Sequence, residues 1–171
     1  MIPATPQGVW DKMRDQLVPL LGAALHIEIT DTWSSHYEDW FKELEVQSFR
    51  ESLRYNSEEL QAILREENVL FLFIVSNEIP EGVILGYPVK SESDAVFYFD
   101  TFAIRRRGKG IGRIVLRSII EWAEMSGFKA IDLDTEAMNE IGIPLQKFYE
   151  DFGFVVQRID DDGNIKMRLV L

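Results

Sequence analysis

A basic, glycine-rich segment connects two strongly patterned stretches of this sequence, and it constrains the fold more than any other feature. Residues 96–104 form an apolar run typical of a β-strand, and residues 111–126 carry apolar side chains at helical spacing. The connecting segment, 105–113, reads RRRGKGIGR. The pattern therefore predicts a strand, a glycine loop and a helix in immediate succession.

The charge of this segment is opposite to that of the chain. The 171 residues carry a formal charge of -11, yet residues 101–120 contain no Asp or Glu and hold six of the eighteen Lys and Arg residues. Glycines allow close backbone approach, and the unpaired N–H groups at a helix start attract anions. Each exposed charge–dipole contact contributes about 0.3–1 kcal/mol. The loop therefore predicts a site for a multiply charged anion such as a diphosphate.

The spacing of the loop distinguishes between known phosphate-binding patterns. No Ser or Thr follows the Gly-Lys pair, as the ATPase loop requires, and the glycines do not follow the dinucleotide pattern G-x-G-x-x-G. Instead, Arg107-x-x-Gly110-x-Gly112 resembles the [QR]-x-x-G-x-[GA] loop of the GNAT (GCN5-related N-acetyltransferase) family. Residues 147–154, KFYEDFGF, resemble the late signature of the same family. The resemblance covers residues 68–171 well and residues 25–67 in outline.

Composition sets further bounds on fold and location. The length suits one domain, and a hydrophobic content of 46% suits a globular one. The absence of cysteine excludes disulfides and thiolate nucleophiles, and it is compatible with a reducing cytosol. His26 and His36 lie in no metal-spaced cluster, so no metal site is expected. The apolar run 17–25 is too short to span a membrane, and no signal-peptide core is present, so we expect a cytoplasmic protein.

The periodicity along the chain predicts an α/β fold with a sheet of mixed direction. We expect the following elements: a helix over 7–22, a strand over 25–30, two helices within 33–67 with Ser57 capping the second, strands over 69–75, 83–89 and 96–104 with a turn over 77–82, a helix over 111–126 ended by Gly127, a strand over 130–134, a short helix opened by Pro144, and a hairpin of strands 154–159 and 165–171. The resemblance implies a mostly antiparallel GNAT-like central sheet flanked by helices. We expect an N-terminal helical extension over 1–24 and a single acetyltransferase domain over 25–171.

The resemblance also implies that acetyl-CoA (coenzyme A) is the cofactor. In the family, two central strands diverge, the strand before the loop offers main-chain groups to the pantetheine arm, and the loop amides hold the pyrophosphate. An asparagine after the next strand contacts the cofactor, which points to Asn139, although spacing from Tyr149 puts that position at Gly142. The cofactor-binding residues implied in this way are Phe102, Ala103, Ile104, Arg107, Gly108, Lys109, Gly110, Ile111, Gly112, Arg113 and Asn139.

Three residues are candidates for catalysis. Tyr149 matches the family tyrosine near the sulfur, and a phenol with a pKa of about 10 is a suitable donor to a thiolate. Helical spacing between aromatic neighbours also allows it to be a core residue. Asp100, in an apolar strand, and Glu136, after the next strand, are candidate bases. Asp100 is equally open to a role as a hydrogen-bonded structural acid.

These observations predict an N-acyltransferase in which a primary amine attacks the thioester directly within a ternary complex. The acceptor is a small molecule or peptide, and the acidic surface favours a cationic one. Four aromatic residues are candidates to line its pocket: Trp33, Tyr37, Trp40 and Phe41. One alternative is a non-catalytic acyl-CoA sensor. Another is nucleic-acid binding through the arginine run, which the acidic field opposes; we expect no nucleic-acid or membrane partner and a monomer or homodimer.

Overall fold

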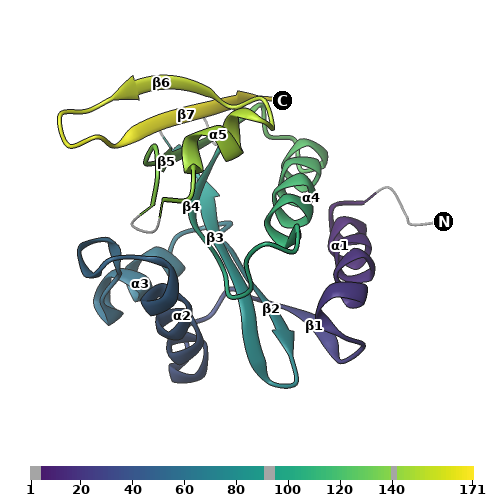
Figure 1. Ribbon diagram of the computed structural model, residues 1–171. Helices are drawn as coiled ribbons and strands as arrows, with labels where there is room; N and C mark the ends of the chain where they lie inside the picture. Colours follow the sequence, from purple (N-terminus) through teal and green to yellow (C-terminus); the bar gives the residue numbers. More distant parts are fainter. Residues whose placement is uncertain (1–4, 91–94, 140–141) are drawn as a thin grey trace.

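A computed structural model describes residues 5–90, 95–139 and 142–171, and its centre is a seven-stranded sheet (Figure 1). The strands are β1 Leu25–Thr30, β2 Leu70–Ser76, β3 Ile79–Pro88, β4 Val96–Ile104, β5 Ala130–Thr135, β6 Val155–Ile159 and β7 Ile165–Val170. The helices are α1 Pro6–Leu21, α2 Ser35–Ser48, α3 Ser57–Leu64, α4 Ile111–Met125 and α5 Leu145–Glu150, with a 3-10 turn at Glu51–Leu53. The predicted order of elements is confirmed.

The sheet has the order β1-β2-β3-β4-β5-β7-β6, and β4–β5 is its one parallel pair. All other neighbours are antiparallel, as the mixed, mostly antiparallel prediction requires. The parallel pair needs a crossover, which α4 supplies between the ends of β4 and β5. The basic glycine segment therefore lies at the entrance of the crossover helix.

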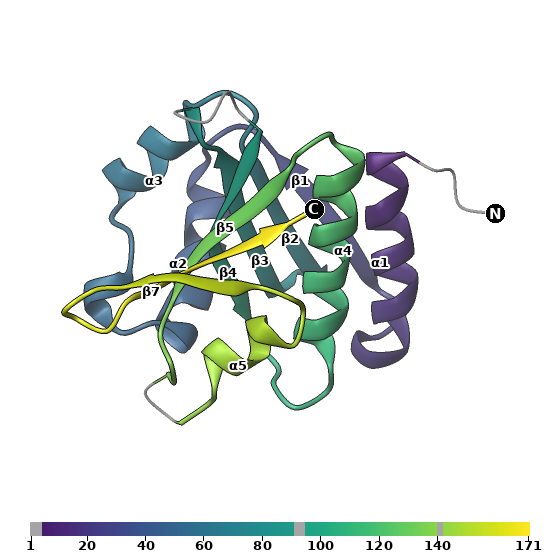
Figure 2. The ribbon, with the colours of Figure 1, turned by 90° about the horizontal axis from the view of Figure 1, so that it is seen from above.

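Helices cover both faces of the sheet and create two apolar clusters (Figure 2). The first cluster joins α1 and α4 to one face, and the second joins α2 and α3 to the other. Strand β2 is buried throughout, and its side chains alternate: Leu72 and Ile74 belong to the first cluster, Phe71 and Phe73 to the second. The nearly continuous apolar run thus reflects burial on both faces, as predicted.

The predicted N-terminal helix packs directly on the core. The side chain of Thr5 accepts a hydrogen bond from the Gly8 N–H and caps α1, which continues through Pro19 to Leu21. Trp10 packs against Trp122 of α4 with 5.7 Å between the ring centroids. Within the described residues, no helix has both the length and the apolar character needed to cross a membrane.

Two local predictions were wrong by a few residues. The second helix of the 33–67 region is capped by Asn56, which forms a reciprocal capping box with Glu59; Ser57 is its first helical residue. The predicted turn over 77–82 is shorter, since β3 already begins at Ile79. Asn77 and Glu78 both have positive φ, as a two-residue hairpin loop demands.

Candidate functional site

The central sheet opens between β4 and β5. Parallel pairing joins Val96 to Ala130, Phe97 to Ile131 and Tyr98 to Asp132, and it does not continue beyond these pairs. The second half of β4 keeps its pairing with β3, whereas the end of β5 pairs with β7. Residues 99–104 therefore have one sheet edge without a strand partner, which confirms the divergence that the family resemblance implies.

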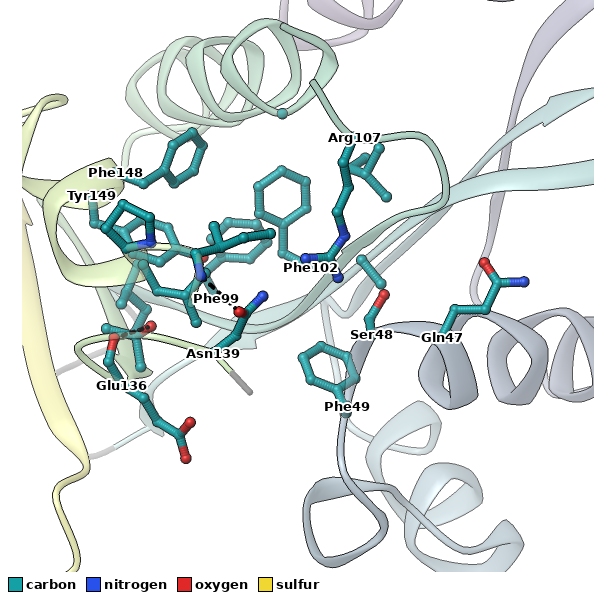
Figure 3. A pocket seen from close by; sticks show the side chains of 18 of the residues that line it. Gln47, Ser48, Phe49, Phe99, Phe102, Arg107, Glu136, Asn139, Phe148 and Tyr149 are labelled. Atoms are coloured by element: carbon teal, nitrogen blue, oxygen red, sulfur yellow. Dashed lines mark hydrogen bonds between the residues drawn. The ribbon is translucent and has the colours of Figure 1, made fainter. Parts of the chain in front are cut away.

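A cavity of about 700 Å³ occupies this opening, a volume typical of small-molecule sites (Figure 3). Four segments contribute its wall: residues 46–54 from the last turn of α2 onward, residues 99–113 from β4 to the start of α4, residues 133–139 from the end of β5 onward, and residues 143–151 around α5. In Figure 3, Phe49 and Ser48 lie on one side, and Glu136 and Asn139 lie on the other.

The glycine loop presents main-chain donors at one end of the cavity. Gly108 and Gly110 have left-handed φ values of 79° and 78°, which a side chain would strain. The first helical hydrogen bond runs from the Ile114 N–H to the Gly110 carbonyl. Within the described residues, the N–H groups of 108–113 have no backbone or side-chain acceptor. They therefore form an array of free donors at a helix N-terminus, which suits a polyanion.

The basic side chains near the loop differ in their availability. Arg107 extends from the loop towards the cavity and has no carboxylate partner among the residues that the structure describes (Figure 3). Arg106 instead pairs with the buried carboxylate of Glu81 at 2.9 Å, and Arg113 pairs with Asp151 at 3.1 Å. Arg107 is thus the basic side chain of the loop best placed to contact a ligand.

Most of the predicted cofactor-binding residues meet at this cavity. Ten of them line it: Phe102, Ala103, Ile104, Arg107, Gly108, Gly110, Ile111, Gly112, Arg113 and Asn139. Lys109 is exposed and lies outside the lining. The Asn139 side chain accepts a hydrogen bond from the Ile143 N–H at 2.9 Å and so braces its own loop. Gly142, the position given by spacing, is not in the lining.

Tyr149 lies on α5 at the cavity wall. Its ring packs against Phe148 and Phe154, with centroids 5.2 Å and 5.7 Å away. Its hydroxyl has no hydrogen-bond partner within the described ranges. Burial raises the pKa of this phenol, so it stays protonated at neutral pH. The residue therefore combines core packing with a hydroxyl that is available to the cavity.

Asp100 lies on β4 where β4 and β5 diverge, and it lines the cavity. Its carboxylate accepts hydrogen bonds from the hydroxyls of Tyr55 (2.6 and 2.8 Å), Tyr87 (2.8 Å) and Thr101 (3.1 Å). Burial, and then the charge of Asp100, raise the pKa values of Tyr55 and Tyr87. These phenols remain donors, and they stabilise a fixed negative charge at this position.

Glu136 lies just after β5 and closes the cavity on the opposite side. It forms an ion pair with Arg50 from the segment after α2. The two side chains are 86 positions apart in the sequence, so no local pattern predicts their contact. Nearby, Asp134 accepts a hydrogen bond from the Tyr98 hydroxyl at 2.6 Å.

The wall formed by residues 46–54 was not predicted from the sequence. The aromatic residues expected to line an acceptor pocket lie elsewhere: Trp40 and Phe41 belong to the second apolar cluster, and Trp33 and Tyr37 lie outside the cavity lining. Helical spacing placed them on one face, and that face packs on the sheet. The cavity wall is instead the last turn of α2 and the chain after it, with its short 3-10 turn, for which periodicity carries little signal.

Comparisons with known proteins agree with this geometry. The family model described as "Acetyltransferase (GNAT) family" matches residues 30–154. A search of curated protein sequences finds no significant match.

Solved structures share the fold at low sequence identity. The ribosomal-protein-S18-alanine N-acetyltransferase from Escherichia coli has a TM-score of 0.63 at 17% identity, covering 85% of this chain and 94% of its own. Arabidopsis thaliana Naa50, solved in complex with the bisubstrate analogue CoA-Ac-MVNAL, has a TM-score of 0.65 at 20% identity, covering 87% and 100%. An acetyltransferase from Streptococcus agalactiae has a TM-score of 0.64 at 20% identity, covering 87% and 99%.

Proposed function

Because the chain belongs to the acetyltransferase (GNAT) family, whose members use acetyl-CoA, we propose that it acetylates a primary amine by direct attack within a ternary complex. The observation that carries this proposal is one cavity that joins three features: the unpaired edge of β4, the free amides at the start of α4, and the Tyr149 hydroxyl.

The residues present fit coenzyme A. The unpaired edge of residues 99–104 can pair with the amide groups of a pantetheine arm, as a neighbouring strand would. The amides of 108–113 and the Arg107 side chain suit a pyrophosphate. Lys109, on the exposed side of the loop, is proposed to reach the ribose phosphate.

Bound acetyl-CoA supplies an activated acyl carbon and a thiolate leaving group. With the thioester bound, the amine would form a C–N bond to the acyl carbon and the C–S bond would break, and Tyr149 would donate a hydrogen bond to the departing sulfur. Burial raises the pKa of this phenol, so it keeps its proton and acts as a donor to the developing thiolate. No protein nucleophile is needed, which agrees with the absence of cysteine.

The ammonium form of the acceptor must lose a proton before it attacks, and we assign different roles to the two carboxylates of the site. We assign proton acceptance to Glu136, because its ion pair with Arg50 is the one constraint that an entering acceptor can replace. Asp100 is held by three hydroxyl donors and suits a fixed charge that attracts the ammonium form to the site. Asn139 supports this arrangement by bracing the loop beyond Glu136.

The alternative is a sensor that binds acyl-CoA without turnover. Incubation of the purified protein with acetyl-CoA and a panel of amines, with release of free thiol as the readout, separates the two. Amine-dependent release is the expected result. Saturable CoA binding without release for any amine would reject catalysis and leave the sensor. The reducing compartment favoured by the cysteine-free composition leads us to propose a cytoplasmic location.

A further inference from the structure

The acceptor side of the cavity carries two arginines to which the proposed mechanism assigns no contact with a ligand. Arg50 and Arg54 both line the cavity from the chain between α2 and α3. Arg50 pairs with Glu136 across the cavity. Arg54 is partly buried, and its Nε donates to the Phe49 carbonyl at 2.7 Å. In the part of the chain that the structure describes, no carboxylate lies within ion-pair distance of Arg54.

The carboxyl group of Glu45 interacts electrostatically with Arg54 but compensates its positive charge only in part. Arg54 acts on the buried carboxyl of Glu45, whose own hydrogen bond is to the Tyr55 N–H at 2.8 Å. Burial raises the pKa of Glu45 to about 7, so this group is largely protonated or only half ionised near neutral pH. A guanidinium at a cavity wall without an ionised partner is suited to bind an anionic group of a ligand.

The opposite wall has the complementary charge. Asp134 and Glu136 line the cavity at the end of β5, facing the segment that carries the arginines. The segment that carries the arginines also has apolar side chains in the wall: Val46 and Leu53 line the cavity with 61% and 46% of their surface exposed. This end of the cavity therefore offers a cationic side, an anionic side and an apolar contact.

We propose that the acceptor is a zwitterion, a free α-amino acid with an apolar side chain. Its carboxylate binds Arg54 and Arg50, and its amino group lies on the side of Glu136 and Asp134. The acceptor carboxylate replaces Glu136 on Arg50, and its ammonium replaces Arg50 on Glu136, so neither charged group loses its partner when the ion pair opens. Val46 and Leu53 contact the side chain. This inference rests on the proposed acetyl transfer.

A matched series of amines tests the inference. Thiol release from acetyl-CoA is measured with leucine, methionine and phenylalanine, with their amides, with 3-methylbutylamine, and with a peptide that begins with leucine. Loss of the carboxylate is expected to lower kcat/KM by about 10- to 100-fold, as for other charge-assisted contacts of an arginine. Equal or better use of the amides or of 3-methylbutylamine would overturn the zwitterion, and preference for the peptide would assign the site to N-termini.

A variant then assigns the effect to Arg54. Arg54→Gln is expected to raise KM for the free amino acids about 10-fold and to leave the amides and the CoA affinity unchanged. Arg65→Gln, at an exposed position outside the cavity, is the matched control. An equal change for amino acids and amides would reject the carboxylate contact. Turnover with amides alone rejects this inference but keeps acetyl transfer, whereas no turnover with any amine rejects both.

Discussion

The two sides of the cavity are built in different ways. The cofactor side is mainly one continuous segment, 99–113, and its ligand-binding groups are backbone amides and carbonyls beside glycines. The acceptor side combines side chains from the chain after α2, from β4 and from the end of β5. The first side suits the acetyl-CoA that the whole family uses, and the second side is where we propose that this chain binds its own acceptor.

The difference also appears in the charged groups. On the cofactor side, Arg107 and the loop amides face the cavity without protein partners in the described residues. On the acceptor side, nearly every carboxylate is already engaged, Asp100 by tyrosine hydroxyls and Glu136 by Arg50. In the proposed function, cofactor binding therefore gives acceptors to donors that have none, whereas acceptor binding exchanges one ion pair for two others.

The largest expected effect is on the cofactor side. Gly110→Asp puts a carboxylate among the free amides, and we expect it to weaken CoA binding by at least about 100-fold because like charges repel in a partly desolvated site. Isothermal titration calorimetry measures the change. Gly110→Ala is the control, since a Cβ there meets no atom within 4 Å and adds only the strain of a left-handed φ. Similar affinity of the Asp variant and the wild type would mean that the phosphates bind elsewhere.

Tyr149→Phe tests whether the Tyr149 hydroxyl, which in the proposed function lies between the cofactor side and the acceptor side, contributes to catalysis. Removal of the hydroxyl keeps the ring contacts with Phe148 and Phe154, so we expect CoA affinity and thermal stability to be unchanged. We expect kcat to fall about 100-fold, the usual contribution of a positioned proton donor. Tyr37→Phe, outside the cavity, is the control. Undiminished kcat would make Tyr149 a core residue alone.

A pair of carboxylate variants separates catalysis from architecture on the acceptor side. Glu136→Gln is expected to lower kcat about 10-fold with little change in the free energy of unfolding, because it removes the proton acceptor. Asp100→Asn is expected to cost about 1–3 kcal/mol in the free energy of unfolding, because it leaves hydroxyl donors from Tyr55 and Tyr87 poorly matched. Kinetics and urea denaturation on both variants test the division. A loss of kcat of about 10-fold in Asp100→Asn, with kcat unchanged in Glu136→Gln, would exchange the two roles.

The smallest effect concerns Glu45, which is 2% exposed behind the acceptor wall. Burial raises the pKa of Glu45 to about 7, so the folded state holds a proton that the unfolded state has lost between about pH 5 and pH 7. Its contribution to stability is present at low pH and is lost as the pH rises through 7, by about 1–3 kcal/mol. In Glu45→Gln this loss should be absent in denaturation curves at pH 5 and pH 8. A parallel pH dependence in variant and wild type would contradict it.

The same contrast explains how much the sequence predicts. Strand β4, the glycine loop and α4 are readable because backbone geometry there is set by local residues: glycines at positive φ and an apolar helix face. The sequence identifies Tyr149 as a candidate site residue because it lies within a contiguous family-like signature, residues 147–154. The sequence does not predict the contact of Arg50 with Glu136, since this contact depends on where the segment after α2 crosses the open sheet.

The aromatic residues of α2 show why the sequence predicts the wrong residues for the acceptor wall. Trp40 and Phe41 carry a clear helical period, and that period reports the face that packs on β2 and β3. The cavity wall after α2 holds only a single 3-10 turn, Glu51–Leu53, and side chains such as Arg54 reach the cavity from it without any repeat. The net charge of -11 affects the long-range attraction of an acceptor from solution, but it gives no information on the charge of individual groups in the cavity, such as these arginines.

The central claim is that backbone amides at the start of α4 hold the cofactor, and hydrogen–deuterium exchange tests it most directly. Exchange is measured by mass spectrometry with and without saturating coenzyme A. The account predicts slower exchange in residues 108–113, where the amides gain acceptors, and little change in residues 46–54. Saturable binding of coenzyme A that leaves exchange in 108–113 unchanged would contradict it.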